Sequence, residues 1–224
     1  MPTTINLNKG GAIVGTQDST QAAARDEASG TSINTGGVTQ AVQYFASAGR
    51  GGGTFRYTRT FLQFDTSGIT GTVSEAILNI ESHSTQNDSD VIICASDAFG
   101  GTNDDLINND FNNVDFSTAY SSELTTWNAN GSNNAITLNA AARSVIQSGN
   151  SFICAAVDHD ADFQDTDTQS GNGADAAGIN FSGTITLVVT VASGYGNNVS
   201  GVASANISKI DGVATANIEK VINV

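Results

Sequence analysis

The chain has 224 residues, of which 39% are hydrophobic, so it is long enough to bury the core of one large domain or of a domain with an appendage. Its formal net charge of −14, with only eight lysines and arginines, argues against DNA or an anionic membrane as a partner, because both are recognised by clustered cations. The 24 glycines, the single proline and the many Ser, Thr and Asn residues indicate short strands joined by tight turns.

Residues 1–55 have a weak apolar pattern, at Ile5, Leu7, Ile13 and Val14, which predicts an early strand followed by looser loops. The glycine-rich run 48–54 is interpreted as a flexible connection. We assign 1–55 as an N-terminal strand and loop region that forms part of the main domain. The first residues lack the basic and apolar segments of a Sec-type signal peptide, and no apolar run is long enough to span a membrane, so we expect neither.

From residue 56 onward the patterning is that of short β-strands separated by turns. In the second strand, Ala76, Leu78 and Ile80 alternate and so share one face. The predicted strands are 57–65, 73–82, 91–95, 124–127, 135–138, 152–157 and 184–192, and the long loops are 99–116 and 158–178. One helix is expected over 140–148, because Asn139 can cap its start and Gly149 can end it. The sequence therefore predicts an all-β sandwich over 56–195 with one short helix.

The two cysteines, Cys94 and Cys154, lie in similar apolar strands, which favours two buried thiols. A Ser or Cys hydrolase is not expected, because the chain has no Gly-x-Ser-x-Gly motif, and the only histidines, His83 and His159, are interpreted as strand-end or loop residues. We expect a protein that is not an enzyme.

The end of the chain contains two copies of an eleven-residue repeat, at 201–211 and 212–222, in which only the fourth, eighth, tenth and eleventh positions differ. Two copies are too few to bury their own apolar side, so the segment 196–224 is predicted to be an attachment tail that needs a partner. The initial Gly and the β-branched residues favour extended structure, while an eleven-residue period also suits a helix. The predicted assembly residues are Val202, Ile207, Ile210, Val213, Ile218 and Val221.

Two further candidate sites lie in the body. Asp158, Asp160 and Asp162 place carboxylates at alternate positions, as a structural Ca²⁺ would require, although a solvated acidic loop explains the same pattern. No other cofactor is expected. Tyr120 and Trp127 could stack on a surface glycan if they are exposed, and the alternative is that they pack in the core.

The stretch 57–69, Tyr-Thr-Arg-Thr-Phe-Leu-Gln-Phe-Asp-Thr-Ser-Gly-Ile, and the following Gly71 to Ile80 resemble the strand pair of DNRLRE-type jelly-roll domains. Trp127 and the helix before Phe152 resemble the second half of that family. The resemblance implies a jelly-roll-type β-sandwich, of the kind found in secreted, cell-surface and virion proteins and in carbohydrate-binding modules. In that motif Arg59, near Asp65, is expected to serve as a structural ion pair or turn anchor.

The repeats at 201–222 resemble the C-terminal ends of structural proteins from tailed bacteriophages. This resemblance implies a virion structural protein, made in the host cytoplasm, which decorates the head or belongs to a fibre or tail. The expected partners are other virion proteins and further copies of the chain, most simply in a homotrimer that covers exposed strand edges. The alternative function is a carbohydrate-binding module for receptor or cell-surface adhesion.

Overall fold

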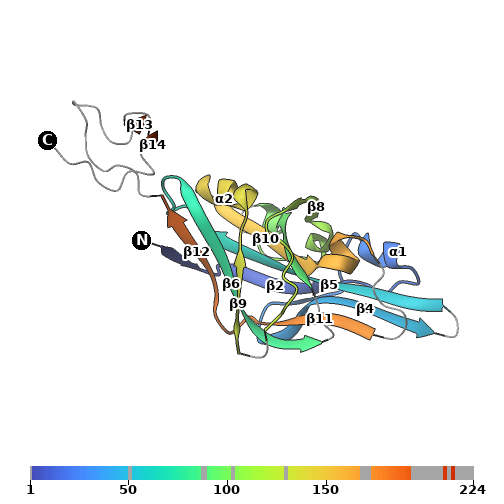
Figure 1. Cartoon of the computed structure of the whole chain (residues 1–224). Coiled ribbons are helices and arrows are strands. Elements are labelled where there is room, and N and C mark those ends of the chain that lie inside the picture. Colours follow the sequence, from blue (N-terminus) through green and yellow to red (C-terminus); the bar gives the residue numbers. More distant parts are fainter. Residues whose placement is uncertain are drawn as a thin grey trace.

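A computed structural model describes residues 2–49, 52–86, 90–101, 104–128, 131–166, 173–192, 209–210 and 213–214. Residues 2–192 of this set form an antiparallel β-sandwich, shown in Figure 1, which confirms the predicted all-β, jelly-roll-type class. The strands are β1 (Thr3–Asn6), β2 (Lys9–Val14), β3 (Ser32–Asn34), β4 (Val38–Gly49), β5 (Gly52–Asp65), β6 (Val73–Gln86), β7 (Val91–Ser96), β8 (Val114–Ala119), β9 (Asn133–Thr137), β10 (Ser151–Asp158), β11 (Gly173–Asn180) and β12 (Ile185–Val191).

Strand β5 is the centre of the larger layer. Along one edge it pairs with β2, and along the other it pairs first with β4 and then with β10. Its Phe55 has partners on both edges, Ala46 of β4 and Asp18 after β2. Strand β10 continues to β7 and β8, and β4 continues to β11. The N-terminal region 1–55 is therefore part of the same sandwich.

Strand β6 connects this layer to the smaller one. Its first part, Val73 to Ile80, pairs with β12, whose other edge holds β1, while β9 pairs with β6 on the opposite side. Its later residues, from Ser82 to Gln86, pair with β11 of the larger layer. One long strand thus serves both layers, which explains why its apolar alternation is clear only in its first half.

Successive residues of β5 face two different cores, as the two-residue period of a strand requires. Leu62 and Phe64 point into the inner core, which lies between the two layers and contains Leu78, Ile80, Trp127, Leu138, Phe152, Cys154 and Leu187. Tyr57 and Phe61 point into an outer core, on the opposite face of the larger layer, which contains Ile13, Tyr44, Cys94, Phe111 and Val157. Each fully buried Leu or Phe contributes about 1.5–3 kcal/mol.

Short helices cover the outer core. They are α1 (Gln21–Arg25), the 3₁₀ segments η1 (Phe99–Gly101) and η2 (Asn108–Asn112), and a π-helix, η3 (His159–Phe163). None of these was expected. The predicted helix is confirmed as α2 (Ala140–Gln147), where the Asn139 side chain accepts from Ala142 N and Gly149 follows with a φ of +76°.

Four local expectations were wrong. The loops predicted before residue 55 contain the twelve-residue strand β4, and Gly49 and Gly52 at the predicted flexible connection are paired ends of the β4–β5 hairpin. The predicted loop 158–178 begins with η3 and ends in β11. The loop 99–116 contains η1, η2 and the start of β8. The strand expected at 124–127 consists of one bridge, between Leu124 and Val91.

Candidate functional site

The three aspartates of the predicted calcium loop have three different surroundings. Asp158 ends β10 and is buried, and its carboxylate caps η3 by accepting from Ala161 N at 2.8 Å. Asp162 is also buried and faces Arg59, whereas Asp160 is half-exposed beside His159. The structure therefore does not bring the three carboxylates together around one point, because the backbone of η3 turns successive side chains in different directions.

Asp162 and Arg59 form an ion pair inside the outer core. Arg59 Nε and Nη2 donate to the two carboxylate oxygens of Asp162 at 2.8 and 2.7 Å, and both side chains are 1% exposed or less. The remaining donors of Arg59 reach two backbone carbonyls, that of Phe111 at 2.8 Å and that of Arg25 at 2.7 Å. The guanidinium also lies over the Phe111 ring, 4.2 Å from its centroid. One side chain thus connects β5 to α1, η2 and η3.

Arg59 is therefore structural, in agreement with the role expected of it, but its partner is Asp162 and not Asp65. Asp65 instead anchors the turn after β5 by accepting from Ser67 N at 3.0 Å. Hydrogen bonds from the Ser67 side chain and backbone lower the pKa of Asp65. Each of the three guanidinium nitrogens of Arg59 donates a hydrogen bond inside the protein, so this cluster is part of the outer core.

A second group of ionisable residues lies at the surface, where β7 begins and β10 ends. The imidazole Nδ1 of His159 lies 2.8 Å from Asp160 Oδ1 and 3.3 Å from Glu123 Oε1. Within the described part of the chain, these three residues are the one group of three whose ligand atoms are close enough to hold a metal ion, with all such atoms within 4.8 Å of one another. Asp160 is the only predicted metal ligand that belongs to it.

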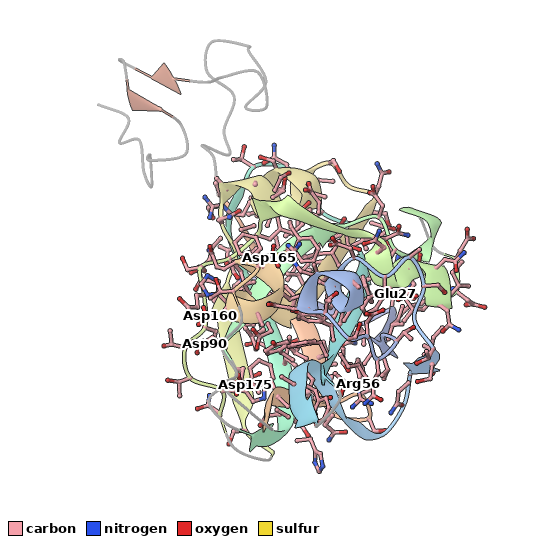
Figure 2. All side chains as sticks on the ribbon, turned by 90° about the vertical axis from the view of Figure 1, so that its right-hand side faces the viewer. Glu27, Arg56, Asp90, Asp160, Asp165 and Asp175 are labelled. Atoms are coloured by element: carbon pink, nitrogen blue, oxygen red, sulfur yellow. The ribbon has the colours of Figure 1, made fainter. Side chains whose placement is uncertain are left out.

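Two neighbouring carboxyl groups hold their protons more tightly than usual. Burial, followed by hydrogen bonding and repulsion from Glu123, raises the pKa of Asp90 to about 6. Burial is also the main cause that raises the pKa of Asp158 to about 7, with Asp162, Asp175 and Asp160 adding repulsion. Figure 2 shows Asp90 and Asp160 next to each other on one flank of the body, with Asp175 nearby. The sequence did not predict this group, because Asp90 and Glu123 are distant in sequence from His159.

A cavity of about 710 Å³ lies elsewhere, at the connection between β1 and β2. Its lining combines amides and hydroxyls with apolar side chains. It also includes an exposed ion pair, 2.9 Å long, between Lys9 Nζ and Asp105 Oδ1. The lining residues are Asn6, Leu7, Asn8, Lys9, Gly10, Thr35, Phe99, Asp105, Leu106, Phe181, Gly183, Thr184, Ile185 and Thr186. The sequence did not predict this cavity, because its lining residues come from segments that are far apart in the chain.

The aromatic residues predicted as glycan contacts are not available for stacking. Tyr120 and Trp127 are 6% and 7% exposed and belong to the inner core. The Trp127 indole donates to Gly178 O at 3.1 Å, and the Tyr120 ring packs on that of Phe152. Burial leaves neither ring a free face for a sugar, so the alternative weighed for them, core packing, is the correct one.

The two cysteines are free and buried, as predicted. They lie on adjacent strands, where Ala155 pairs with Cys94, so Cys94 faces the outer core and Cys154 the inner core. Burial raises the pKa of Cys94 to about 12 and also raises that of Cys154. Because thiolates are the reactive form, neither thiol is placed or ionised to act as a nucleophile.

Most of the predicted assembly residues, namely Val202, Ile207, Ile218 and Val221, lie outside the described residues. Ile210 and Val213 are described in backbone only. They pair with each other in a short antiparallel hairpin between β13 (Lys209–Ile210) and β14 (Val213–Ala214), at the junction of the two repeats. These four residues have the extended conformation that was favoured over a helix.

Among the described residues, none of the helices has the length and apolar character needed to cross a bilayer. No protein-family model matches the chain, and a search of curated proteins found no significant relative. The resemblances to DNRLRE-type jelly rolls and to phage structural proteins therefore depend on the residues quoted for them, within a fold that is an all-β sandwich.

Proposed function

We propose that this chain is a non-enzymatic structural protein of a tailed-bacteriophage virion, on the outer surface of the head, a fibre or the tail. In this proposal the sandwich is the displayed body and the repeat segment 196–224 attaches it. Copies of the chain assemble as a homotrimer and contact other virion proteins through the tail. Localisation is the virion, after synthesis in the host cytoplasm.

The observation that carries this proposal is the contrast between body and tail. Over the described residues, Ile107 is the only large hydrophobic side chain that is exposed, at 55%. The described body therefore shows no cluster of exposed large apolar side chains. The tail, in contrast, contains six β-branched residues at corresponding positions of two repeats, which need a partner to be buried. Assembly through the tail is the arrangement that this distribution favours.

The chemistry of the body also fits a role without catalysis. The ion pair between Arg59 and Asp162 is buried, and both thiols lie inside the cores, where burial raises their pKa. These groups hold the sandwich together and present nothing to a substrate.

The test is incorporation into particles. Deleting residues 199–224 is expected to abolish incorporation while leaving the sandwich folded, as judged by circular dichroism and by the fluorescence of Trp127, the only tryptophan. A finer variant changes the equivalent isoleucines of the two repeats, Ile207→Ser with Ile218→Ser. Its matched control exchanges the naturally different fourth positions, Ser204→Thr with Thr215→Ser. Normal incorporation of the deleted chain would refute the proposal, and sedimentation analysis of the full chain tests the trimer.

A second candidate, a carbohydrate-binding module for receptor or surface adhesion, is favoured by the 710 Å³ cavity. Its volume lies within the range of small-ligand sites, and its mixture of amide, hydroxyl and apolar groups suits a ring that has both polar edges and apolar faces. In a glycan array, Asn6→Ala should reduce any signal, whereas Thr4→Ala, on the same strand but outside the cavity, should not. Absence of signal with every glycan would remove this candidate.

A further inference from the structure

The group formed by Glu123, His159 and Asp160 is held by the backbone of three chain segments. His159 N donates to the carbonyl of Asp90, at 2.8 Å, directly before β7. Leu124, next to Glu123, forms two hydrogen bonds with Val91, of 2.8 and 3.1 Å. Asp158, which precedes His159, is paired with the same Val91. The backbone at the three residues is therefore fixed before any ligand arrives, which lowers the cost of organising a site.

Two of the three separations between the ligand atoms are close to those around a small tetrahedral ion, and the third is at most 4.8 Å. In a zinc site with bonds of roughly 2.0–2.2 Å, neighbouring ligand atoms are about 3.4 Å apart. The two contacts of His159 Nδ1, 2.8 Å to Asp160 Oδ1 and 3.3 Å to Glu123 Oε1, are close to this separation. Small shifts of the two partly exposed carboxylates would bring the ligand atoms to the separations of a tetrahedral site. An imidazole nitrogen is a preferred ligand of transition metals, whereas Ca²⁺ and Mg²⁺ select oxygen.

The charges around the site favour a cation. Among the ion pairs of the described residues, none joins Asp160 or Glu123 to a lysine or an arginine, and the contact of both carboxylates is the His159 imidazole. The Asp90 carboxyl lies within hydrogen-bonding reach of Glu123 and brings a third carboxyl group to the site. A divalent ion would balance carboxylates that the chain itself leaves largely uncompensated.

Two further contacts, to Phe163 and Gln164, hold the imidazole ring of His159 in place. The ring of His159 stacks on that of Phe163, with centroids 5.9 Å apart and an interplanar angle of 20°. Its Nε2 lies 3.4 Å from the side-chain amide of Gln164. That amide can turn its oxygen toward Nε2–H, which would leave Nδ1 as the metal ligand, as outer partners of metal-binding histidines commonly do.

We propose that Glu123, His159 and Asp160 bind a divalent transition-metal ion, with Zn²⁺ as the ion that fits best. His159 Nδ1 and one oxygen from each carboxylate are the three protein ligands, and water takes the fourth position. Binding uses the lone pair of Nδ1, so the imidazole carries its one proton on Nε2, beside the Gln164 amide. The ion fastens the segment around Glu123 to the ends of β7 and β10. This inference is independent of the proposed virion role.

The test uses the full chain, freed of metal with a chelator and titrated calorimetrically with ZnCl₂, CaCl₂ and MgCl₂ in separate arms. We expect one Zn²⁺ per chain, a rise in melting temperature with Zn²⁺, and much weaker binding of Ca²⁺ and Mg²⁺. Replacing the bound ion with Co²⁺ gives an absorption spectrum that reports tetrahedral coordination.

Variants locate the site. His159→Gln and Glu123→Gln should each weaken Zn²⁺ binding at least tenfold, the lower end of the loss that even outer partners of metal sites cause. The matched control is His83→Gln, which removes the only other histidine and should bind Zn²⁺ like the parent chain. Trp127 fluorescence verifies folding, and Glu123→Gln keeps the test valid if the His159 variant does not fold. Equal or tighter binding of Ca²⁺, unchanged binding in both site variants, loss of binding in His83→Gln, or no Zn²⁺ binding would each overturn the proposal.

Discussion

Arg59 offers the sharpest test of how the outer core is held together. Arg59→Met keeps the length and apolar stem of the side chain but removes the guanidinium, leaving the Asp162 carboxylate 1% exposed without its two hydrogen bonds. Breaking a buried ion pair from one side costs about 3–5 kcal/mol. Arg25 Nε lies 3.8 Å from Asp162 Oδ1 and offers partial compensation, so we expect a loss of about 3 kcal/mol. That is a large part of the roughly 5–15 kcal/mol typical of whole domains.

The loss is measured by urea unfolding followed through the fluorescence of Trp127. The double variant Arg59→Met with Asp162→Leu removes both charges, so it should be more stable than Arg59→Met alone, although the carbonyls of Phe111 and Arg25 still lose their donor. Arg143→Met is the control, since Arg143 is only half-buried and donates to the backbone carbonyl of Leu138 instead of to a buried carboxylate. A loss below about 1 kcal/mol in Arg59→Met, or a double variant no more stable than it, would refute the reasoning.

Three further outcomes are expected. Neither Cys94 nor Cys154 should react with a thiol reagent at pH 8 in the native protein, because both are buried and protonated. Both should react once the protein is unfolded in urea, and mass spectrometry counts the labels. Asn139→Ala should lower the free energy of unfolding by about 1 kcal/mol, since the start of α2 loses its cap, as the same urea titration would reveal. Gly149→Ala should cost about 1 kcal/mol for its positive φ, measured as a fall in melting temperature; an unchanged value would contradict the left-handed conformation.

Strands with strong β-formers were predictable because their own residues favour the extended state. Val91–Ser96, Ser151–Asp158 and Ile185–Val191 are of this kind. Strand β11 (Gly173–Asn180) was not predictable, because Gly-Ala-Asp-Ala-Ala-Gly has no strand preference of its own. It is held by hydrogen bonds to β4 on one side and β6 on the other. In β11, pairing with two neighbouring strands stabilises an extended conformation that its own residues do not favour.

The polar sites were also only partly predictable, because local residues suggest ligands but distant residues supply the partners. Alternating aspartates after residue 157 predicted ligands for one ion, but their actual partners depend on residues far away in the chain. Arg59, which takes Asp162, is 103 residues distant. Glu123, which accompanies Asp160 and His159, is brought near by the bridge between Leu124 and Val91. A local pattern cannot reveal such pairings, since the sheet register decides them.

The position of β5, with β2 on one edge and β4 and β10 on the other, determines how this body comes apart. Its residues Thr60 to Gln63 are bonded on both edges, and the side chains of Phe61 and Leu62 are fully covered on opposite faces. Their amide hydrogens can exchange with solvent only when the whole sandwich opens. Deuterium uptake at these amides should therefore report the global free energy of unfolding, whereas the short edge strand β1 exchanges earlier through local fraying.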